Sequence, residues 1–406
     1  MRSAPLVRLA TAAALLYPGV AHAHDYVLDY TSTLTLAATR APDVIAAAGV
    51  IDAARGRRAA STLANPELDV EAGPRLRDGA PTTTDVAVGL SQAFELGGQR
   101  GARRDGARAT VDHAIADADD ARRLARRDAG LAYYRAVLAA ERVTLAERSA
   151  AVATELQDLT ARRQARGEAV ALDVNLARAT AARARAALRT AHADREDALG
   201  ALRALLALEP TDTLAVRGDL AARAAPTLDA LLAAAHRRPE LRALDARRAE
   251  GAALAAVGDA QAWPSLTLGV RYEREEQADI VLGGVTITLP TWDRGHGDRR
   301  EGRAIATHAR LARDAHTRAI DATVRAAFAA YTLRRAAVDD LVRDVAPLLD
   351  ANDSLLGKAY AAGQLSLADT LVARRELDET RRDVLEHRFA LAVAAVELDA
   401  AAGVVP

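Results

Sequence analysis

The clearest pattern in the chain is an alternation of apolar and polar positions in four short runs. From 266 to 273 every second residue is apolar, and threonine, glycine, arginine and glutamate stand between them. Residues 281–289 form a partner run after a polar tip, and a similar pair of runs lies closer to the N-terminus. Period two predicts strands, and paired runs joined by a polar turn predict hairpins. The sequence therefore predicts two β-hairpins, at about residues 65–96 and 263–291.

Long helical segments follow both hairpins. Residues 99–208 contain no proline and are rich in alanine, arginine, leucine and glutamate. We expect a helical hairpin here that reverses near Gly167 into two helices of about 50 residues, each about 75 Å long. A second helical hairpin is expected over residues 297–402, with its reversal near Gly363. Apolar residues of its last helix are seven apart, the spacing of coiled-coil contacts: Leu377, Val384, Leu391 and Leu398.

The chain also repeats itself. Three short motifs recur after 196 to 198 residues, and a nearly constant offset indicates a duplicated unit. We expect the first repeat to span residues 24–210 and the second 211–406. Each opens with one helix, predicted over residues 32–58 and 227–257. The motif pairs are Asn65-Pro66-Glu67-Leu68 with Trp263-Pro264-Ser265-Leu266, Arg166-Gly167 before Asp173 with Ala362-Gly363 before Asp369, and Pro42-Asp43-Val44 with Pro239-Glu240-Leu241.

The first 23 residues have the order of a secretory signal. Arg2 and Arg8 precede or interrupt an apolar run, and Ala21-His22-Ala23 supplies a small-x-small cleavage site. An amphipathic helix of the mature chain is the alternative, but the Pro18-Gly19 pair disfavours it. We expect cleavage after Ala23 and export from the cytoplasm.

Composition removes several classes of function. The net charge of −1 gives no electrostatic case for nucleic acid, and the absence of cysteine excludes disulfides and thiolate metal sites. About a quarter of the chain is alanine and only 3% is aromatic, which favours closely packed long helices. No nucleophile, paired-acid or triad arrangement is visible, so no enzyme activity and no cofactor are expected. His308 and His316, eight residues apart on one helix, are about 12 Å from each other and cannot share an ion, so no metal site is expected.

Four strands cannot close a barrel alone, and an isolated hairpin is marginal in water. Their apolar faces have the length of membrane-spanning strands, so each chain is expected to supply one part of a shared barrel. Leu268, Val270, Val285 and Ile287 are the expected lipid-facing residues. A periplasmic coiled coil with two solvent-exposed hairpins remains the alternative.

The duplicated order of elements resembles the TolC family of outer membrane factors, the exit ducts of tripartite efflux and type I secretion systems. Three motifs carry the resemblance: the strand start at Asn65-Pro66-Glu67-Leu68 and the reversals Arg163-x-x-x-Gly167 and Tyr360-x-x-Gly363. One segment is similar to a segment of the heavy-metal, CzcC-type branch of this family: Glu95-Leu96-Gly97-Gly98-Gln99-Arg100-Gly101. The lack of a lipidated cysteine also fits that branch.

The resemblance implies a mainly helical protein with membrane strands, built as a TolC-like duplicated α-β-β-α-α unit. It implies a homotrimer in which a 12-stranded β-barrel continues into a 12-helix periplasmic α-barrel. Such a duct sits in the outer membrane and conducts passively, with an inner-membrane RND pump and a periplasmic adaptor protein as partners. Heavy-metal cations are the substrate that the branch implies; drug efflux and type I secretion are the alternatives within the family.

The resemblance also gives roles to residues of the two reversals. Arg163, Gly167 and Gly363 are expected at the periplasmic tip, where the tunnel closes and the adaptor docks. Pro347 matches a proline that lies in mid-helix in the family, and it should end or kink the helix. Its counterpart in the first repeat is Ala151.

A channel gate is expected just past the second reversal. Asp369 matches a position that forms a ring of aspartates at the entrance, where carboxylates would attract cations. Asp173 and Tyr360 match partners in the hydrogen bonds that hold the tip shut. Leu365 replaces a linking arginine and Val372 replaces a second aspartate ring, so closure should be weaker or built differently.

Overall fold

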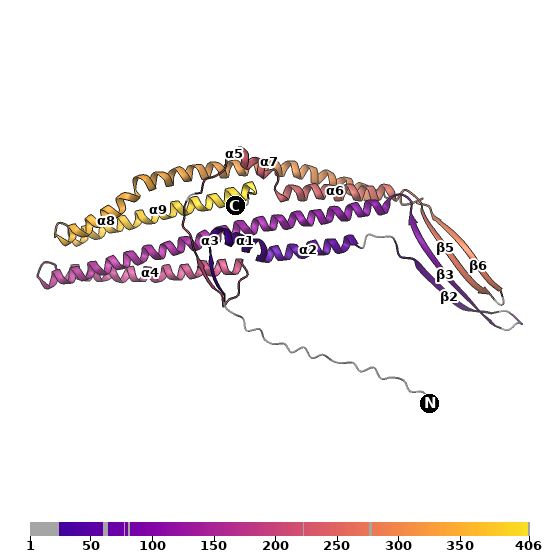
Figure 1. Cartoon of the computed structure of the whole chain (residues 1–406), viewed down its shortest axis with the longest axis horizontal. Coiled ribbons are helices and arrows are strands. Elements are labelled where there is room, and N and C mark those ends of the chain that lie inside the picture. Colours follow the sequence, from indigo (N-terminus) through magenta and orange to yellow (C-terminus); the bar gives the residue numbers. More distant parts are fainter. Residues whose placement is uncertain are drawn as a thin grey trace, which may run out of the picture.

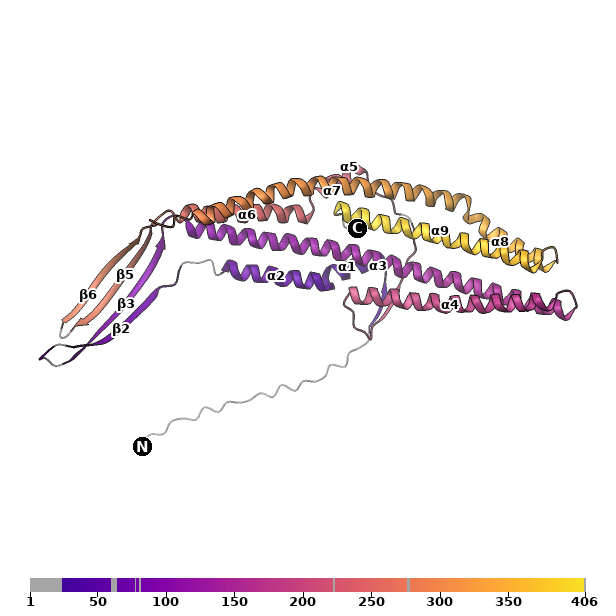
Figure 2. The ribbon, with the colours of Figure 1, turned by 180° about the vertical axis from the view of Figure 1, so that it is seen from behind.

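The computed structural model shows a long, narrow molecule (Figures 1 and 2). Four strands lie at one end, the turns between the long helices lie at the other, and two short strands lie near the middle. The expected signal peptide, residues 1–23, lies outside the described residues. The structure describes residues 24–59, 64–76, 78–79, 82–221, 223–275 and 278–404.

Helices dominate the described part of the chain. The strands are β1 (Asp25–Leu28), β2 (Glu67–Arg75), β3 (Thr83–Glu95), β4 (Thr213–Val216), β5 (Ser265–Glu275) and β6 (Ala278–Thr288). The helices are α1 (Tyr30–Arg40), α2 (Pro42–Ala59), α3 (Gln99–Ala165), α4 (Ala171–Leu205), α5 (Leu228–Ala235), α6 (Pro239–Ala260), α7 (His296–Asp344), α8 (Ala346–Ala361) and α9 (Leu367–Ala402).

The four long strands form one antiparallel sheet in the order β2-β3-β5-β6. The two hairpins pair with each other through β3 and β5, so strands about 180 residues apart become neighbours: Leu90, for example, lies opposite Val270. Both outer strands, β2 and β6, have an unpaired edge within the described sheet. A free edge of this length invites further strand pairing.

The single helix expected before each hairpin is wrong, because both helices are broken. α1 ends before Ala41 and α2 starts at Pro42, while α5 and α6 are separated by a turn that ends at Pro239. Proline has no N–H to donate to the preceding turn, and it fits the first position of a new helix. Among the described helices, none is by itself long and apolar enough to cross a membrane; only the bent pair α1–α2 meets that test jointly.

The first long hairpin is strongly asymmetric, which corrects the expectation of two helices of equal length. α3 has 67 residues and α4 only 35, so α3 extends for about 100 Å. Beyond the end of α4, α1 and α2 take over as the neighbours of α3 (Figure 1). The second half has the same arrangement. α9 packs along the part of α7 nearer the helical turns, and α6 lies along the part of α7 nearer the four-stranded sheet.

The kink expected at Pro347 is confirmed. α7 ends at Asp344 and α8 begins at Ala346, which places Pro347 at the start of the new helix. α3 runs without a break through Ala151, the corresponding position of the first half. The two long hairpins therefore differ at this position: the helix is continuous in the first and broken in the second.

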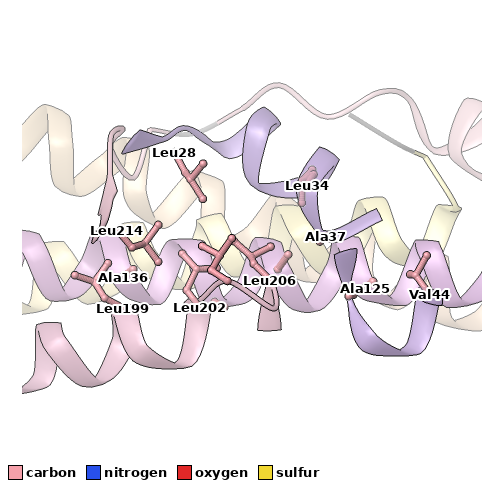
Figure 3. Close-up of a cluster of buried hydrophobic side chains, with 14 residues drawn as sticks. Leu28, Leu34, Ala37, Val44, Ala125, Ala136, Leu199, Leu202, Leu206 and Leu214 are labelled. Atoms are coloured by element: carbon pink, nitrogen blue, oxygen red, sulfur yellow. The ribbon is translucent and has the colours of Figure 1, made fainter. Parts of the chain in front are cut away.

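A small parallel sheet joins the two halves near the middle of the molecule, and the sequence patterns did not predict it. β1 pairs with β4 from Asp25 opposite Thr213 to Leu28 opposite Val216. Leu28 and Leu214 point from these strands into a core shared with α1, α3 and α4 (Figure 3). Strands of four residues carry too little alternation to be recognised from sequence.

Candidate pore entrance and membrane face

The two helical turns at one end of the molecule have the same backbone geometry. Gly167 and Gly363 have φ values of +79° and +74°, a left-handed conformation that favours glycine. In both turns the residue after the glycine donates its N–H back to the helix: Glu168 N to Arg163 O and Gln364 N to Ala359 O, each at 2.9 Å. These hydrogen bonds end each helix in one turn, so both reversals lie at the positions that the sequence predicts.

Tyr360 lies inside one protomer and ties α8 to α3. It is 3% exposed, and its hydroxyl is 2.8 Å from the hydroxyl of Thr160. The Arg163 guanidinium stacks 5.1 Å from the ring centroid and donates to the Tyr360 carbonyl at 3.2 Å. Cation–π stacking and two hydrogen bonds therefore hold the two turns together within one chain.

The two aspartates expected at the gate lie on equivalent first turns but are held differently. Asp369 is exposed at the start of α9, accepts the Ser366 hydroxyl at 2.6 Å and donates its own N–H to Ser366 Oγ at 3.1 Å. Asp173 starts α4, whose N-cap residue Val170 offers no side-chain bond. Within the described chain no hydrogen bond or ion pair joins either aspartate to Tyr360, so the structure does not bring these three residues together.

The two departures from the family pattern also lie near this end. Leu365 is partly buried in the turn between α8 and α9, and Val372 is 71% exposed on α9. Neither side chain can supply the charge or hydrogen bond expected at its position.

A groove of about 1080 Å³ lies between α4 and α9, and residues 142–156 of α3 contribute to its wall. Apolar residues such as Leu156, Leu176 and Leu371 line it together with a set of arginines. The arginines are Arg142, Arg148, Arg183, Arg374, Arg375, Arg381 and Arg382.

One carboxylate at the edge of this groove binds three arginines, a cluster that the sequence analysis missed. Asp353 on α8 is 2.8 Å from Arg148 of α3, and 2.9 Å and 3.3 Å from Arg374 and Arg381 of α9. Burial alone would raise the pKa of Asp353, but the hydrogen bond from Arg148 and the three positive charges lower it below its usual value. The only sequence signal is the seven-residue spacing of Arg374 and Arg381, which puts both on one helix face.

At the opposite end the strand register separates an apolar from a polar face. Leu268 pairs with Val285, and Val270 continues through Leu90 to Leu68 along one side of the sheet. The predicted lipid-facing set, Leu268, Val270, Val285 and Ile287, shares this side, and all four are 45% to 66% exposed. A one-sided apolar surface of this kind is unusual for a sheet that meets water on both faces.

The polar face of the sheet carries an excess of acid. Arg75 lies 2.7 Å from Asp85 and 3.0 Å from Glu275, and Arg271 pairs with Glu71 and Glu273. The acidic residues on this face are Glu67, Asp69, Glu71, Asp85, Glu95, Glu273 and Glu275, against Arg75 and Arg271. Among the described residues, no group of three histidine, aspartate or glutamate side chains is arranged to hold a metal ion.

Comparisons with known proteins agree with this architecture. A sequence model described as "outer membrane efflux protein" matches residues 33–208. The chain is 28% identical over 360 residues to the cobalt-zinc-cadmium resistance protein CzcC of Cupriavidus metallidurans, covering 87% of this chain and 85% of that protein.

Solved structures share the fold at lower identity. Crystal structures of CusC superpose with a TM-score of 0.76 at 17% identity, covering 96% of this chain and 95% of theirs. The open state of the Neisseria gonorrhoeae MtrE outer membrane channel gives a TM-score of 0.75 at 19% identity, covering 92% of this chain and 88% of its own. The long helical hairpins and the one-sided sheet are thus those of the TolC-like outer membrane channels. Residues 33–208 match the outer membrane efflux protein family, and the chain as a whole shares the fold of these channels.

Proposed function

We propose that the protein is the outer-membrane duct of a tripartite, RND-type efflux system and works as a homotrimer. The observation that carries this proposal is the exposed, one-sided apolar sheet with two free edges, attached to long helices of which α3 extends for about 100 Å. Three copies would pair β6 of one protomer with β2 of the next and close a barrel of twelve strands, which leaves no unpaired edge in lipid. The acidic face of each sheet would then line the lumen.

The proposed route is passive. Substrate enters at the end formed by Gly167 and Gly363, where a periplasmic adaptor contacts Arg163 and its surroundings, and leaves through the barrel. An inner-membrane pump supplies the energy. Residues 1–23 act as a cleaved export signal.

Heavy-metal cations are the proposed substrate. The similarity to a cobalt-zinc-cadmium resistance protein supports this choice, and so does the acidic polar face of the sheet. A lumen with excess carboxylates concentrates cations and repels anions. Drug efflux or protein secretion would not need this charge.

The membrane face can be tested by moving one charge across the sheet. Leu268→Arg should abolish trimer assembly in the outer membrane, because an arginine near the middle of the bilayer costs about 2–4 kcal/mol. Thr267→Arg, one residue away on the polar face, is the matched control and should assemble. Leu289→Arg lies one residue beyond the end of β6 and should be better tolerated. The readout is the mass of the membrane-extracted protein in detergent. A mature protein that is monomeric and soluble without detergent would support the periplasmic coiled coil instead.

The gate assignment needs a separate test. We propose that Asp369 lines the narrowest part of the entrance, so that three copies bind multivalent cations across the axis. Asp369→Asn should then weaken the block of single-channel conductance by divalent cations while the trimer remains intact. Ser366→Ala removes the cap of α9 but not the charge, and should leave the block unchanged. Equal sensitivity to cations in wild type and Asp369→Asn would remove Asp369 from the gate without affecting the duct.

A further inference from the structure

An almost fully buried carboxylate lies where the two short strands at the middle of the molecule begin. Asp212 directly precedes β4 and is 5% exposed. Its Oδ1 accepts a hydrogen bond from the backbone nitrogen of His24 at 3.0 Å, and its Oδ2 accepts one from the N–H of Glu209 at 3.0 Å. The Asp212 N–H donates back to the Glu209 carbonyl at 3.0 Å. The carboxylate is therefore held in a fixed orientation toward the first described residue of the chain.

Among the described residues, this carboxylate differs from the other well-buried acids because no arginine contacts it. Asp353 contacts three arginines, Asp399 pairs with Arg223, and Glu250 lies 2.8 Å from Arg247. For Asp212, the one ionic contact within 4 Å in the described chain is the His24 ring nitrogen at 3.9 Å. A buried negative charge without a close cation is costly, so the site lacks one positive group.

Processing of the chain would place that positive group on the atom already bonded to Asp212. The sequence predicts hydrolysis of the peptide bond between Ala23 and His24 by a signal peptidase. Water adds across this bond, so that Ala23 leaves with a new carboxylate and His24 gains an α-amino group, which is protonated at neutral pH. The nitrogen that becomes the ammonium is the His24 nitrogen, 3.0 Å from Asp212 Oδ1.

We propose that Asp212 is the binding site for the α-ammonium group that signal cleavage creates on His24. The hydrogen bond from an amide then becomes a charge-assisted hydrogen bond, which is roughly twice as strong. The contact fixes the start of β1 against β4, where Thr213 N already donates to the His24 carbonyl at 3.1 Å. Removal of the signal thus completes the buried site. The inference rests on the export signal of the proposed function and not on conduction.

The mass of the chain purified from membranes gives the first test. A mature chain that begins at His24 supports the proposal. Any other N-terminus overturns it, because the His24 nitrogen would then be an uncharged amide or absent. Neither result bears on whether the trimer conducts ions, which single-channel recording measures independently.

Amine chemistry gives the second test, and the composition makes it unusually clean. The whole chain has one lysine, Lys358, which is exposed on α8. A mature chain therefore carries two amines, and Lys358 serves as the internal reference for acetylation by a soluble N-hydroxysuccinimide ester. An α-amine normally reacts faster than a lysine near pH 7, because its usual pKa is about 7.7–8.0 rather than about 10.4. If pairing with Asp212 raises the pKa of the His24 amine, acetylation of that amine near pH 7 should slow about tenfold for each pKa unit.

The variants separate charge from packing. Asp212→Asn keeps the size of the side chain but removes the charge, and should restore fast acetylation of His24 relative to Lys358. Asp25→Asn removes the neighbouring carboxylate, which bonds Thr213 Oγ1 rather than the amine, and should leave the ratio unchanged. His24→Ser keeps the α-amine without the imidazole, so a slow reaction that persists in this variant belongs to the amine.

The pH dependence of acetylation decides the matter in the wild type alone. The charged groups with contacts at this site are the His24 ring, Asp25 at the start of β1, and Asp212 in the loop before β4. An apparent pKa of the His24 amine well above its usual range supports the ion pair. A value within that range, with the same rate in wild type and Asp212→Asn, would reduce Asp212 to a residue that only caps its own turn.

Discussion

The two long hairpins start from the same duplicated plan and end as a rigid and a jointed version of it. α3 is continuous for 67 residues, whereas its counterpart is divided into α7 and α8 at Pro347. The jointed half also carries the Asp353 cluster, which lies six residues past Pro347 and ties the segment below the joint to α3 and α9. The difference teaches that one half keeps an unbroken long helix, while the other has a helix break and ionic contacts that tie the segment beyond it to α3 and α9.

The strongest way to break this comparison is to give the rigid half a joint. Ala151→Pro removes an N–H from the middle of α3 and places the ring against the preceding turn, which costs about 3 kcal/mol or more. We expect a large drop in the unfolding temperature and loss of the trimer, measured by thermal dissociation in detergent. Pro347→Ala is the matched change in the other half, where the helix already ends, and should be tolerated. Equal losses from both changes would contradict the division into a rigid and a jointed half.

Releasing the contacts around the joint should have the next largest effect. Asp353→Asn leaves Arg148, Arg374 and Arg381 without their shared carboxylate, and we expect a loss of about 1.5–3 kcal/mol. Because the pKa of Asp353 is lowered in the folded chain, its contribution is present above the unfolded value near 3.9 and is lost as pH falls through the lowered value.

Hydrogen exchange of α8 measures this directly. Wild-type protection should fall as the pH drops below about 4, whereas Asp353→Asn should be poorly protected and show little change at these pH values. Asp350→Asn is the control, because its carboxylate is 75% exposed and shares two of the same arginines. If both variants show the same protection of α8, the buried Asp353 does not stabilise this helix more than the exposed Asp350 does.

The smallest effect on stability is expected after the last helix of each repeat, where different residues adopt the same left-handed backbone conformation. Ala207 and Gly403, 196 residues apart, both follow the last helix of their half and have φ values of +48° and +66°. Alanine in the left-handed conformation costs about 1–2 kcal/mol relative to glycine. Part of this difference is offset because glycine loses more conformational entropy when the chain folds. Ala207→Gly should therefore raise the free energy of unfolding by about 0.5–1 kcal/mol, measured by denaturant titration. Gly403→Ala should lower it, since a Cβ there would lie 2.8 Å from Arg238 Cγ.

Local patterns in the sequence predict much of the fold. Alternation at residues 266–273 predicts a strand, and Gly167 and Gly363 mark both reversals, because one residue type or one short run decides each feature. Pro42 and Pro239 start new helices, although the helical pattern of the sequence continues on both sides of each proline. Tertiary contacts were harder to predict. The β1–β4 pairing leaves no pattern in the local sequence, and the Asp353 cluster leaves only the spacing of Arg374 and Arg381, since each joins segments that lie far apart in the chain.

The parallel pairing of β1 with β4 has a consequence for the order in which the protein folds. If the chain is exported as proposed, Asp25 would be among the first residues to emerge, yet its partner Thr213 lies 188 residues later. Closing a loop of that length is slow compared with forming the helices and hairpins inside it. In such an exported chain β1 would stay unpaired until the residues up to β4 had also crossed the inner membrane. A periplasmic chaperone that holds extended N-terminal segments would act during this interval.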